Sequence, residues 1–535
     1  MKTYFSLGLN TIVIELKQGG TVFMEYKLEK TLLSASEVVY DSSQEQPVDM
    51  TINLPDYCPD IQKILKCQMY PRITGRGITG DRLELDGNCL VKVFYLDAEG
   101  ATVRCCENTE SFSVAIQLKK PADNGCISAD TRVEYINCRA ANSRRMDIHG
   151  AFSLCARVVC SGDCTVTGAV LDEDVEQELT SVDFTTLTAF ETRPFSVEEV
   201  LELPEGKPGA DTVLHASAAV NSLDFKVIPN KVMIKGDIAL KMLYCPIPEE
   251  GTLPECMEYE IPFTQMVDCG GITDDCRTDL RIQVIACDIQ IKNDYAGDKI
   301  YFDTQIRLLA SVSAYCDGNT AVVSDAYSKK YDATLEYTEA EPESLCDLFE
   351  ETLLEKNTFQ VEGGAERIID VWSEMCDVTA SQRDGGIHFE GKYNICMLAI
   401  NSENGIFYFE RVAEYSFDRP CQAAGELRID ANSIVADMNY RFSSGEVELK
   451  AELRLTAAVF CRRTVRTIER MEADETKPVQ EDPAALCIYY AEKGERFWEV
   501  ARTYRSSVDA ICRENDLTGD SIPDSRMLLI PVHTE

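Results

Sequence analysis

The chain has 535 residues, which is too long for a single hydrophobic core and favours three or four domains. Hydrophobic residues make up 45% and charged residues 27%, an ordinary globular balance that excludes wholesale disorder. The formal net charge of −39 repels phosphate backbones and anionic lipid, so nucleic acid and membranes are not expected partners.

The N-terminal segment MKTYFSLGLNTIVIELKQGG is only weakly similar to a signal peptide. Asn10 and Glu15 interrupt or closely follow its short apolar stretch, and no small-residue cleavage site follows. No apolar run reaches the roughly 18 residues that a membrane helix needs. We therefore predict a protein that is neither secreted nor inserted in a membrane. Met1 and Met24 both stay open as the first residue, so residues 1–23 stay open as part of the first domain.

One strand pattern occurs three times, around Gly87, Gly236 and Gly391, which lie 149 and 155 residues apart. Apolar residues fall on alternate positions before and after each glycine, and the residues between them are mostly polar in the first half of the pattern. Alternation with period two predicts a long strand with one buried face. The predicted strands cover residues 83–95, 232–244 and 387–399.

The repeat continues after these strands. A second short strand with a phenylalanine follows each glycine, at Phe112, Phe263 and Phe417, and an alternating strand closes each unit near Ala151, Thr304 and Ala451. Several antiparallel strands joined by Gly- and Asp-bearing turns predict a β-sandwich or barrel-like domain. Because about 150 residues is far too long for one solenoid repeat, we predict a mainly β protein with tandem antiparallel domains.

Shifts in composition place the domain boundaries. We predict β domains at residues 1–180, 190–335 and 345–470, the third of them divergent. The charged, proline-containing segment MEADETKPVQEDPAAL predicts a polar linker at residues 471–486. A separate module follows at residues 487–535.

The C-terminal module has a different pattern. CIYYAEKGE predicts a short strand that ends in a turn at Gly494, and Phe497, Val500, Ala501 and Tyr504 mark one apolar face of a helix. A second helix follows, with Ser506 and Asp509 in a capping-box arrangement at its start, and DSRMLLIPV predicts a returning strand. We therefore predict a small βααβ fold.

These residues resemble the LysM family. The match comprises Ile488–Glu492, Gly494, Trp498, Ala501, Tyr504, Asn515, Leu528, Ile530 and Pro531. The resemblance implies a module that binds N-acetylglucosamine polymers such as peptidoglycan or chitin. It also implies a groove between two loops, formed by Gly494, Glu495, Arg496 and Phe497 on one side and by Ser521, Ile522, Pro523 and Asp524 on the other.

The two loops depart from the family pattern. Gly494-Glu495-Arg496-Phe497 stands where the family usually has Gly-Asp-Thr-Leu, and Glu and Arg are poorer helix-capping residues than Asp and Thr. Pro523-Asp524 replaces Pro-Gly and adds a charged side chain where backbone should approach a sugar closely. Glycan binding and protein contact therefore both stay open for this groove. Trp498 lies beside the apolar stripe of the first helix, where we expect a packing role.

The body of the chain carries a second resemblance. LPDYCPDIQKIL, at residues 54–65, is similar to the Pro-Asp-Ile-x-x-Ile-Leu opening of the SPOCS domain, in which a strand–Gly–strand–Tyr pattern like residues 83–95 follows. Tandem SPOCS-like units before a LysM module resemble spore-coat morphogenetic proteins of the SipL type. The resemblance implies a protein of the mother-cell cytosol that a polymerising coat ATPase recruits to the forespore through the LysM module. It also implies contacts with other coat proteins.

Three further sequence features are explained by structure and do not indicate a catalytic or cofactor site. Residues 75–80 match GxGxxG, but an alternating strand follows where a dinucleotide site needs a helix, so we predict a hairpin turn. The 23 cysteines lack a dense spacing pattern, which favours free thiols in a reducing compartment. The four histidines are isolated and no P-loop occurs, so we expect no metal, no cofactor and no catalytic residues.

The sequence therefore predicts a non-enzymatic scaffold or adaptor in spore-coat assembly, which docks through its LysM-like module to a coat ATPase. The alternative is LysM-mediated binding of peptidoglycan or another N-acetylglucosamine-containing glycan. An enzyme within the β domains is a third hypothesis and the least favoured. The oligomeric state does not follow from the sequence.

Overall fold

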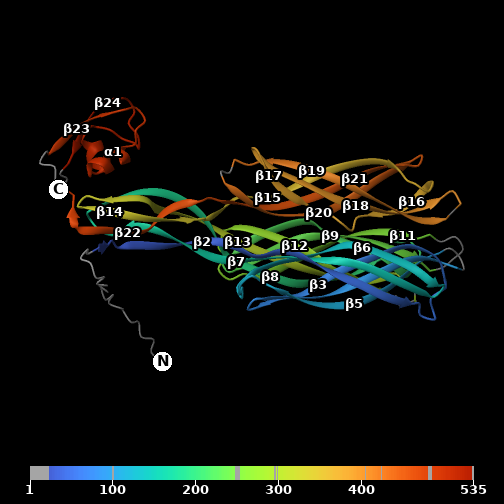
Figure 1. Cartoon of the computed structure of the whole chain (residues 1–535). Coiled ribbons are helices and arrows are strands. Elements are labelled where there is room, and N and C mark those ends of the chain that lie inside the picture. The colour runs from blue at the N-terminus through green and yellow to red at the C-terminus, as the bar shows by residue number, and fades with distance from the viewer. Residues whose placement is uncertain are drawn as a thin grey trace.

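In a computed structural model, the chain folds almost entirely into antiparallel β-sheet (Figure 1). The structure describes residues 23–98, 102–247, 253–293, 297, 299–403, 405–422, 425–479 and 485–532. Three similar units form the broad part of the molecule, and a narrower neck leads from them to a small C-terminal module (Figure 1). The predicted mainly β fold with tandem domains is confirmed.

Units 1 and 2 are β-sandwiches with the same strand order. In unit 1, one sheet has the order β2 (Leu28–Asn53), β7 (Arg145–Val170), β6 (Cys126–Asn142), and the other β3 (Ile61–Thr79), β4 (Arg82–Asp97), β5 (Val103–Gln117). In unit 2, the orders are β8 (Val175–Glu202), β13 (Tyr301–Ser328), β12 (Arg277–Lys292), and β9 (Ala210–Ile228), β10 (Lys231–Pro246), β11 (Glu255–Asp268). One buried apolar cluster lies between the two sheets of each unit. The hairpin predicted at residues 75–80 is confirmed, because β3 turns into β4 at Gly80.

Unit 3 repeats the sandwich with one interruption. Its first sheet has the order β15 (Glu343–Gln360), β21 (Glu446–Arg462), β20 (Glu426–Ser443). In its second sheet, β18 (Gly386–Asn401) pairs with β19 (Ile406–Pro420) on one side and with both β16 (Ala365–Trp372) and β17 (Thr379–Arg383) on the other. β16 and β17 therefore take the place of the single strand β3 or β9, with a break at residues 373–378.

The glycine of each repeat packs under an aromatic ring of the next strand. The pairs are Gly87 with Phe112, Gly236 with Phe263 and Gly391 with Tyr415. A Cβ atom at Gly236 would lie 2.4 Å from the Ser222 carbonyl oxygen and 2.9 Å from the Phe263 ring, so no side chain fits there. The prediction that Phe417 is the third equivalent is wrong, because Phe417 pairs with Phe389 and a tyrosine takes the equivalent position.

The neck consists of three antiparallel strand pairs that continue beyond the sandwiches. Two are the far ends of β2–β7 and β8–β13, and the third is β14 (Tyr331–Ala340) with β22 (Val465–Pro478). The short β1 (Phe23–Glu25) pairs with the other edge of β22. Apolar side chains from all three pairs fill the centre of the neck: Leu33, Val166, Val182, Val322 and Ala340. Each unit thus contributes one strand pair to the neck.

Three predicted boundaries are wrong. β14 runs from Tyr331 to Ala340 and pairs with β22, so the predicted end of the second domain at residue 335 lies inside a strand. β8 runs from Val175 to Glu202, so no connection lies at residues 180–190 and unit 2 begins at Val175. β22 extends to Pro478, so the first half of the predicted linker at residues 471–486 is a paired strand. Its charged residues suggested a linker, but Met471 and Ala473 alternate with them and are buried in the neck. Residues 1–22 and 480–484 lie outside the described residues.

The three sandwiches meet around a shared core built from equivalent strand positions. The residues seven and nine positions after each repeat glycine face this core: Phe94 and Leu96, Leu243 and Cys245, Leu398 and Ile400. The residues four positions after the glycine, Val91, Leu240 and Ile395, face the core of their own sandwich instead. The second halves of β4, β10 and β18 are therefore buried on both faces.

The neighbouring strand has the same register in all three units. Lys66 pairs with Phe94, His215 with Leu243 and Asp370 with Leu398, so these three polar residues occupy equivalent positions beside the shared core. The residues that precede them, Leu65, Leu214 and Ile369, all pack in the shared core. The same packing arrangement thus joins every unit to the other two.

An ion pair crosses each of the three contacts between units. Arg104 of unit 1 lies 3.1 Å from Asp211 of unit 2, and Lys66 of unit 1 pairs with Glu410 of unit 3. Lys241 of unit 2 lies 2.6 Å from Asp370 of unit 3, whose side chain is almost completely buried. Because removal of Lys241 would leave the buried Asp370 charge unpaired, this pair favours a single relative placement of units 2 and 3.

Replacement of the central glycine tests the packing of each sandwich. Gly236→Ala should destabilise the protein by about 3 kcal/mol, because its Cβ overlaps a carbonyl oxygen and an aromatic ring. Gly77→Ala is the matched control, since a Cβ at that strand glycine meets nothing within 4 Å. Denaturant unfolding of both variants measures the difference, and equal midpoints would contradict this packing.

The buried His215 predicts an acid-sensitive contact between units 2 and 3. Its ring packs 4.8 Å from that of Trp372, and its Nε2 atom is buried without a hydrogen-bond partner. Burial, together with the charges of Lys92 and Lys241, lowers the pKa of His215 to about 3. Since the unfolded state takes up a proton below a pH of about 6.5 and the folded state does not, stability falls as the pH falls.

Between pH 7 and pH 5, protonation of His215 in the unfolded state should lower the free energy of unfolding by about 2 kcal/mol. His215→Phe should remove that part of the acid sensitivity, because phenylalanine fills the site and takes up no proton. His149→Phe, at an exposed histidine, should keep it. Denaturant unfolding at both pH values measures the effect, and an unchanged pH dependence in His215→Phe would refute the assignment.

Candidate functional site

The C-terminal module has the predicted βααβ order. It consists of β23 (Leu486–Ala491), α1 (Phe497–Tyr504), α2 (Val508–Glu514) and β24 (Arg526–Pro531), with β23 and β24 antiparallel. Side chains from all four elements form its core: Ala491, Phe497, Val500, Ala501, Ile511, Leu528 and Ile530. The module therefore has a core of its own, to which the body adds one residue, Tyr327.

The start of α2 differs from the prediction by one residue. Ser507, and not Ser506, is the N-cap, and its hydroxyl accepts a hydrogen bond of 3.1 Å from the Ala510 amide. The Ser506 hydroxyl donates instead to the Pro531 carbonyl. Asn515 follows the end of α2, as predicted, and its side chain bonds the Leu529 amide and carbonyl at 2.8 and 2.7 Å. Asn515 thus fixes α2 against β24.

The two loops of the predicted groove are bonded to each other. The Gly494 amide donates to the Ile522 carbonyl at 2.9 Å, and the Ile522 amide donates to the Glu495 carbonyl at 2.9 Å. The Phe497 amide donates to the Asp520 carbonyl at 3.1 Å. Because these bonds use the amide protons of Gly494, Phe497 and Ile522, those three amides are not free to donate to a ligand.

The eight predicted groove residues divide into two sets. Phe497 and Ile522 are buried in the module core, so their side chains cannot line an open groove. Glu495 is half-buried, and its carboxylate accepts hydrogen bonds from the Tyr489 hydroxyl and the Glu492 amide. The residues that remain exposed are Gly494, which has no side chain, and Arg496, Ser521, Pro523 and Asp524. The structure thus brings the loops together but presents few groups for a ligand.

Helix α1 docks on the end of β13, which is a contact that the sequence did not predict. The Trp498 indole nitrogen and the Arg502 guanidinium both donate to the Asp325 carboxylate, at 2.9 and 2.6 Å. The Tyr327 ring is buried against Trp498, with centroids 5.0 Å apart. Trp498 therefore has a packing role. Arg496 and Arg505 add ion pairs with Glu178 and Asp332.

A signal for this docking is present in the sequence. Arg496, Arg502 and Arg505 lie on or beside one short helix in a chain whose net charge is −39. A cluster of arginines next to an acidic body favours a contact between the two. The same contact covers the face of α1, which is thus not available to a partner while the module stays docked.

The outer face of the module's two-stranded sheet is apolar and exposed. Leu486, Ile488 and Tyr490 alternate along β23 with side chains that face the helices, and Met527 of β24 lies opposite Tyr490. Their exposed fractions are 47%, 59%, 76% and 51% in that order. Grouped exposed apolar side chains of this kind are typical of interaction sites. The alternation of apolar residues in LCIYYA is the signal in the sequence for this face.

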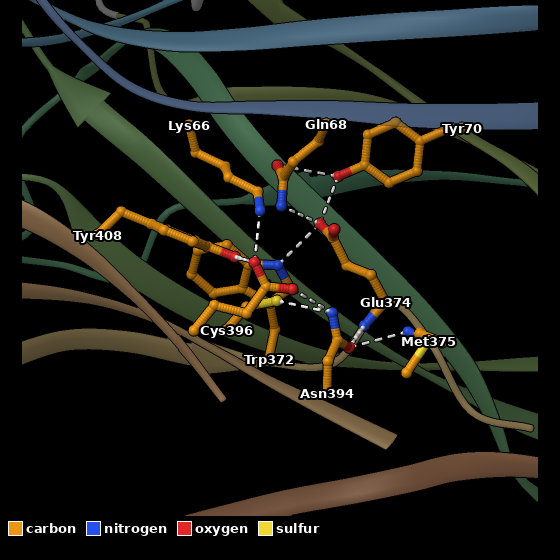
Figure 2. Close-up of polar contacts among 10 residues, drawn as sticks. Lys66, Gln68, Tyr70, Trp372, Glu374, Met375, Asn394, Cys396 and Tyr408 are labelled. Atoms are coloured by element: carbon orange, nitrogen blue, oxygen red, sulfur yellow. Dashed lines mark hydrogen bonds and ion pairs between the residues drawn. The ribbon is translucent and has the colours of Figure 1, made fainter. Parts of the chain in front are cut away.

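A second cluster of functional groups lies where unit 1 meets unit 3 (Figure 2). Glu374 lies in the break between β16 and β17, and its carboxylate accepts hydrogen bonds from Tyr70 at 2.6 Å, Trp372 at 2.9 Å and Gln68. Burial raises the pKa of the Glu374 carboxyl. Glu410, beside it, accepts from Asn394 at 3.0 Å.

The polar groups of this cluster are hydrogen-bonded to one another. Asn394 also accepts from the Glu374 and Met375 amides at 2.8 and 2.9 Å, which holds the break in a fixed shape (Figure 2). Lys66 reaches Glu410 from unit 1. Although burial alone would raise the pKa of the Glu410 carboxyl, hydrogen bonds from Lys66 and Asn394 lower it. The cluster therefore joins two units and is a structural contact.

Within the described ranges, no group of three or more His, Cys, Asp or Glu is arranged to hold a metal ion. The same part of the chain contains no helix that is long and apolar enough to span a membrane.

Comparison with protein families links the body to a known domain. The model of the SipL SPOCS domain matches residues 60–141, from β3 into β6 of unit 1, and residues 210–292, from β9 to β12 of unit 2. The searches of curated proteins and of solved structures gave no match. Two tandem regions of this chain are thus similar to the SipL SPOCS domain, which indicates a role related to sporulation or the spore coat.

Proposed function

We propose that this protein is a non-enzymatic scaffold of spore-coat assembly. Its C-terminal module is of the LysM type and docks to a coat ATPase on the forespore surface, in the mother-cell cytosol. The observation that carries the proposal is the exposed apolar sheet face of a module attached to a body with two SPOCS-like regions. The body adds contacts with further coat proteins.

The outer sheet face is the best candidate for the docking surface. Helix α1 is already covered by Asp325 and Tyr327 of the body, so its face is occupied. The face formed by Leu486, Ile488 and Tyr490 points away from that contact, since the alternate residues of β23 pack on the helices. An exposed tyrosine flanked by aliphatic side chains is a common centre of a protein interface.

The body supports the proposal through its rigidity. A shared core and ion pairs at all three contacts hold the units in a fixed arrangement, and the neck carries the module at one end (Figure 1). A client bound to a unit would then lie at a fixed distance from the docked ATPase. The net charge of −39 favours clients with basic surfaces.

Glycan binding by the two loops is the alternative function. The backbone bonds between Gly494, Glu495 and Ile522 weigh against it, because they leave the Gly494 and Ile522 amides with no proton to donate to a sugar. The side chain of Asp524 adds a charge at the rim. Protein contact needs none of these backbone groups, and for that reason we favour it.

The double variant Ile488→Asp/Tyr490→Asp tests the docking surface in the full-length protein. Two charges on the apolar face should weaken binding of the coat ATPase at least about tenfold, because central interface residues each contribute more than about 1.4 kcal/mol. Leu354→Asp is the matched control, since Leu354 is a 71% exposed aliphatic residue of unit 3. Pull-downs from sporulating-cell lysate, with the ATPase quantified by mass spectrometry, measure retention.

The outcomes separate the two functions. Loss of the ATPase in the double variant, with retention in Leu354→Asp, supports docking through the sheet face. Equal retention in both variants would exclude this face. Sedimentation of the wild-type protein with insoluble peptidoglycan, without ATPase retention, would replace our proposal by glycan binding.

A further inference from the structure

Two cysteine sulfurs of unit 2 lie in contact at one corner of the sandwich. Cys276 precedes β12 and Cys316 lies in β13, and their Sγ atoms are 2.7 Å apart. Because Arg277 pairs with Tyr315, the two cysteines face each other at the next position of the same antiparallel pair. Opposed residues in antiparallel strands have Cα atoms about 4.5–5.5 Å apart, which lies within the range that a disulfide spans.

The surroundings of the pair favour a reactive thiol. The Thr273 hydroxyl lies 3.4 Å from the Cys276 sulfur, and the Thr188 hydroxyl lies 3.7 Å from both sulfurs. Burial alone would raise the pKa of the Cys276 thiol, but hydrogen bonds with Cys316 and Thr273 lower it below its usual value. Cys316 is partly exposed, so the pair lies near the surface of the unit.

The same corner is built differently in the other two units. The strand register places Gly125 opposite Cys160 in unit 1 and Gly425 opposite Arg463 in unit 3. Each glycine lies close to one cysteine sulfur. Because glycine has no side chain, units 1 and 3 have no thiol at the position that Cys276 occupies in unit 2. The sandwich therefore forms without a thiol at this position, and the facing pair is a property of unit 2.

We propose that Cys276 and Cys316 form an internal disulfide by exchange with a low-molecular-weight disulfide. The Cys276 thiolate attacks one sulfur of the reagent, RSSR, and the S–S bond of the reagent breaks. This gives a mixed disulfide on Cys276, and the released RS⁻ takes up a proton to form RSH. Cys316 then loses its proton and attacks the Cys276 sulfur, which releases a second RS⁻ that takes up a proton to form the second RSH. In total, two protein thiols are oxidised to one disulfide and RSSR is reduced to two thiols.

The bond would reinforce the strand that holds the module. It closes a loop between positions 40 residues apart and joins β12 to β13, which continues to Asp325 and Tyr327 beneath α1. A cross-link of this length restricts the unfolded chain. The oxidised protein should therefore unfold at a Tm about 5 °C higher than the reduced protein.

The experiment uses the full-length wild-type protein and oxidised glutathione. After incubation, free thiols are alkylated and a non-reducing digest is analysed by mass spectrometry. We expect peptides that contain residues 276 and 316 to appear cross-linked, with a mass lower by two hydrogens, and to separate on reduction. Cys512, a partly exposed cysteine of the module, is the internal control and should stay alkylated or carry glutathione.

Two results would overturn the proposal. One is full alkylation of both cysteines at glutathione ratios that modify Cys512. The other is a separate glutathione adduct on each of them, because an internal bond would have displaced it. Thermal unfolding of Cys276→Ser/Cys316→Ser provides a second measurement: its Tm should not change with oxidised glutathione, whereas that of the wild-type protein should rise.

Discussion

Burial of β4, β10 and β18 on both faces is the constraint on which the rest of the body depends. One face of each strand fills its own sandwich, and the other face meets the equivalent strands of the neighbouring units around Phe94, Leu243 and Leu398. Without that contact, each sandwich would expose a row of large apolar side chains to water. The shared core therefore turns three tandem units into one body, and the ion pairs at each contact determine how the units are placed.

The proposed scaffold function uses the rigidity of that body. The neck takes one strand pair from each unit, so the position of the module is linked to all three. Asp325 and Tyr327, at the end of β13, then orient α1 and leave the outer sheet face of the module in solvent. Rigid placement of one docking surface relative to the client surfaces is what a scaffold requires.

Much of this arrangement follows from local sequence patterns. Alternation around the three glycines predicted the strands, and the spacing of Phe497, Val500 and Ala501 predicted α1. Which residues are equivalent in the three units was harder to predict, because strand register decides it. In unit 3, Tyr415 and not Phe417 packs on Gly391. Within the predicted groove, the side chains of Phe497 and Ile522 are buried, because resemblance places loops, whereas packing decides which side chains turn inward. The apolar second half of each repeated strand was the available signal for a shared core.

Unfolding of the body tests the shared core most directly. Trp372 lies in the shared core and Trp498 in the module, and these are the two tryptophans of the chain, so Trp498→Phe leaves one fluorescent reporter. If the units depend on the shared core, Trp372 fluorescence and far-UV circular dichroism should give coincident unfolding curves in guanidinium chloride. A fluorescence change at lower denaturant, with the strand signal retained, would contradict the account, because the sandwiches would then fold independently of that core.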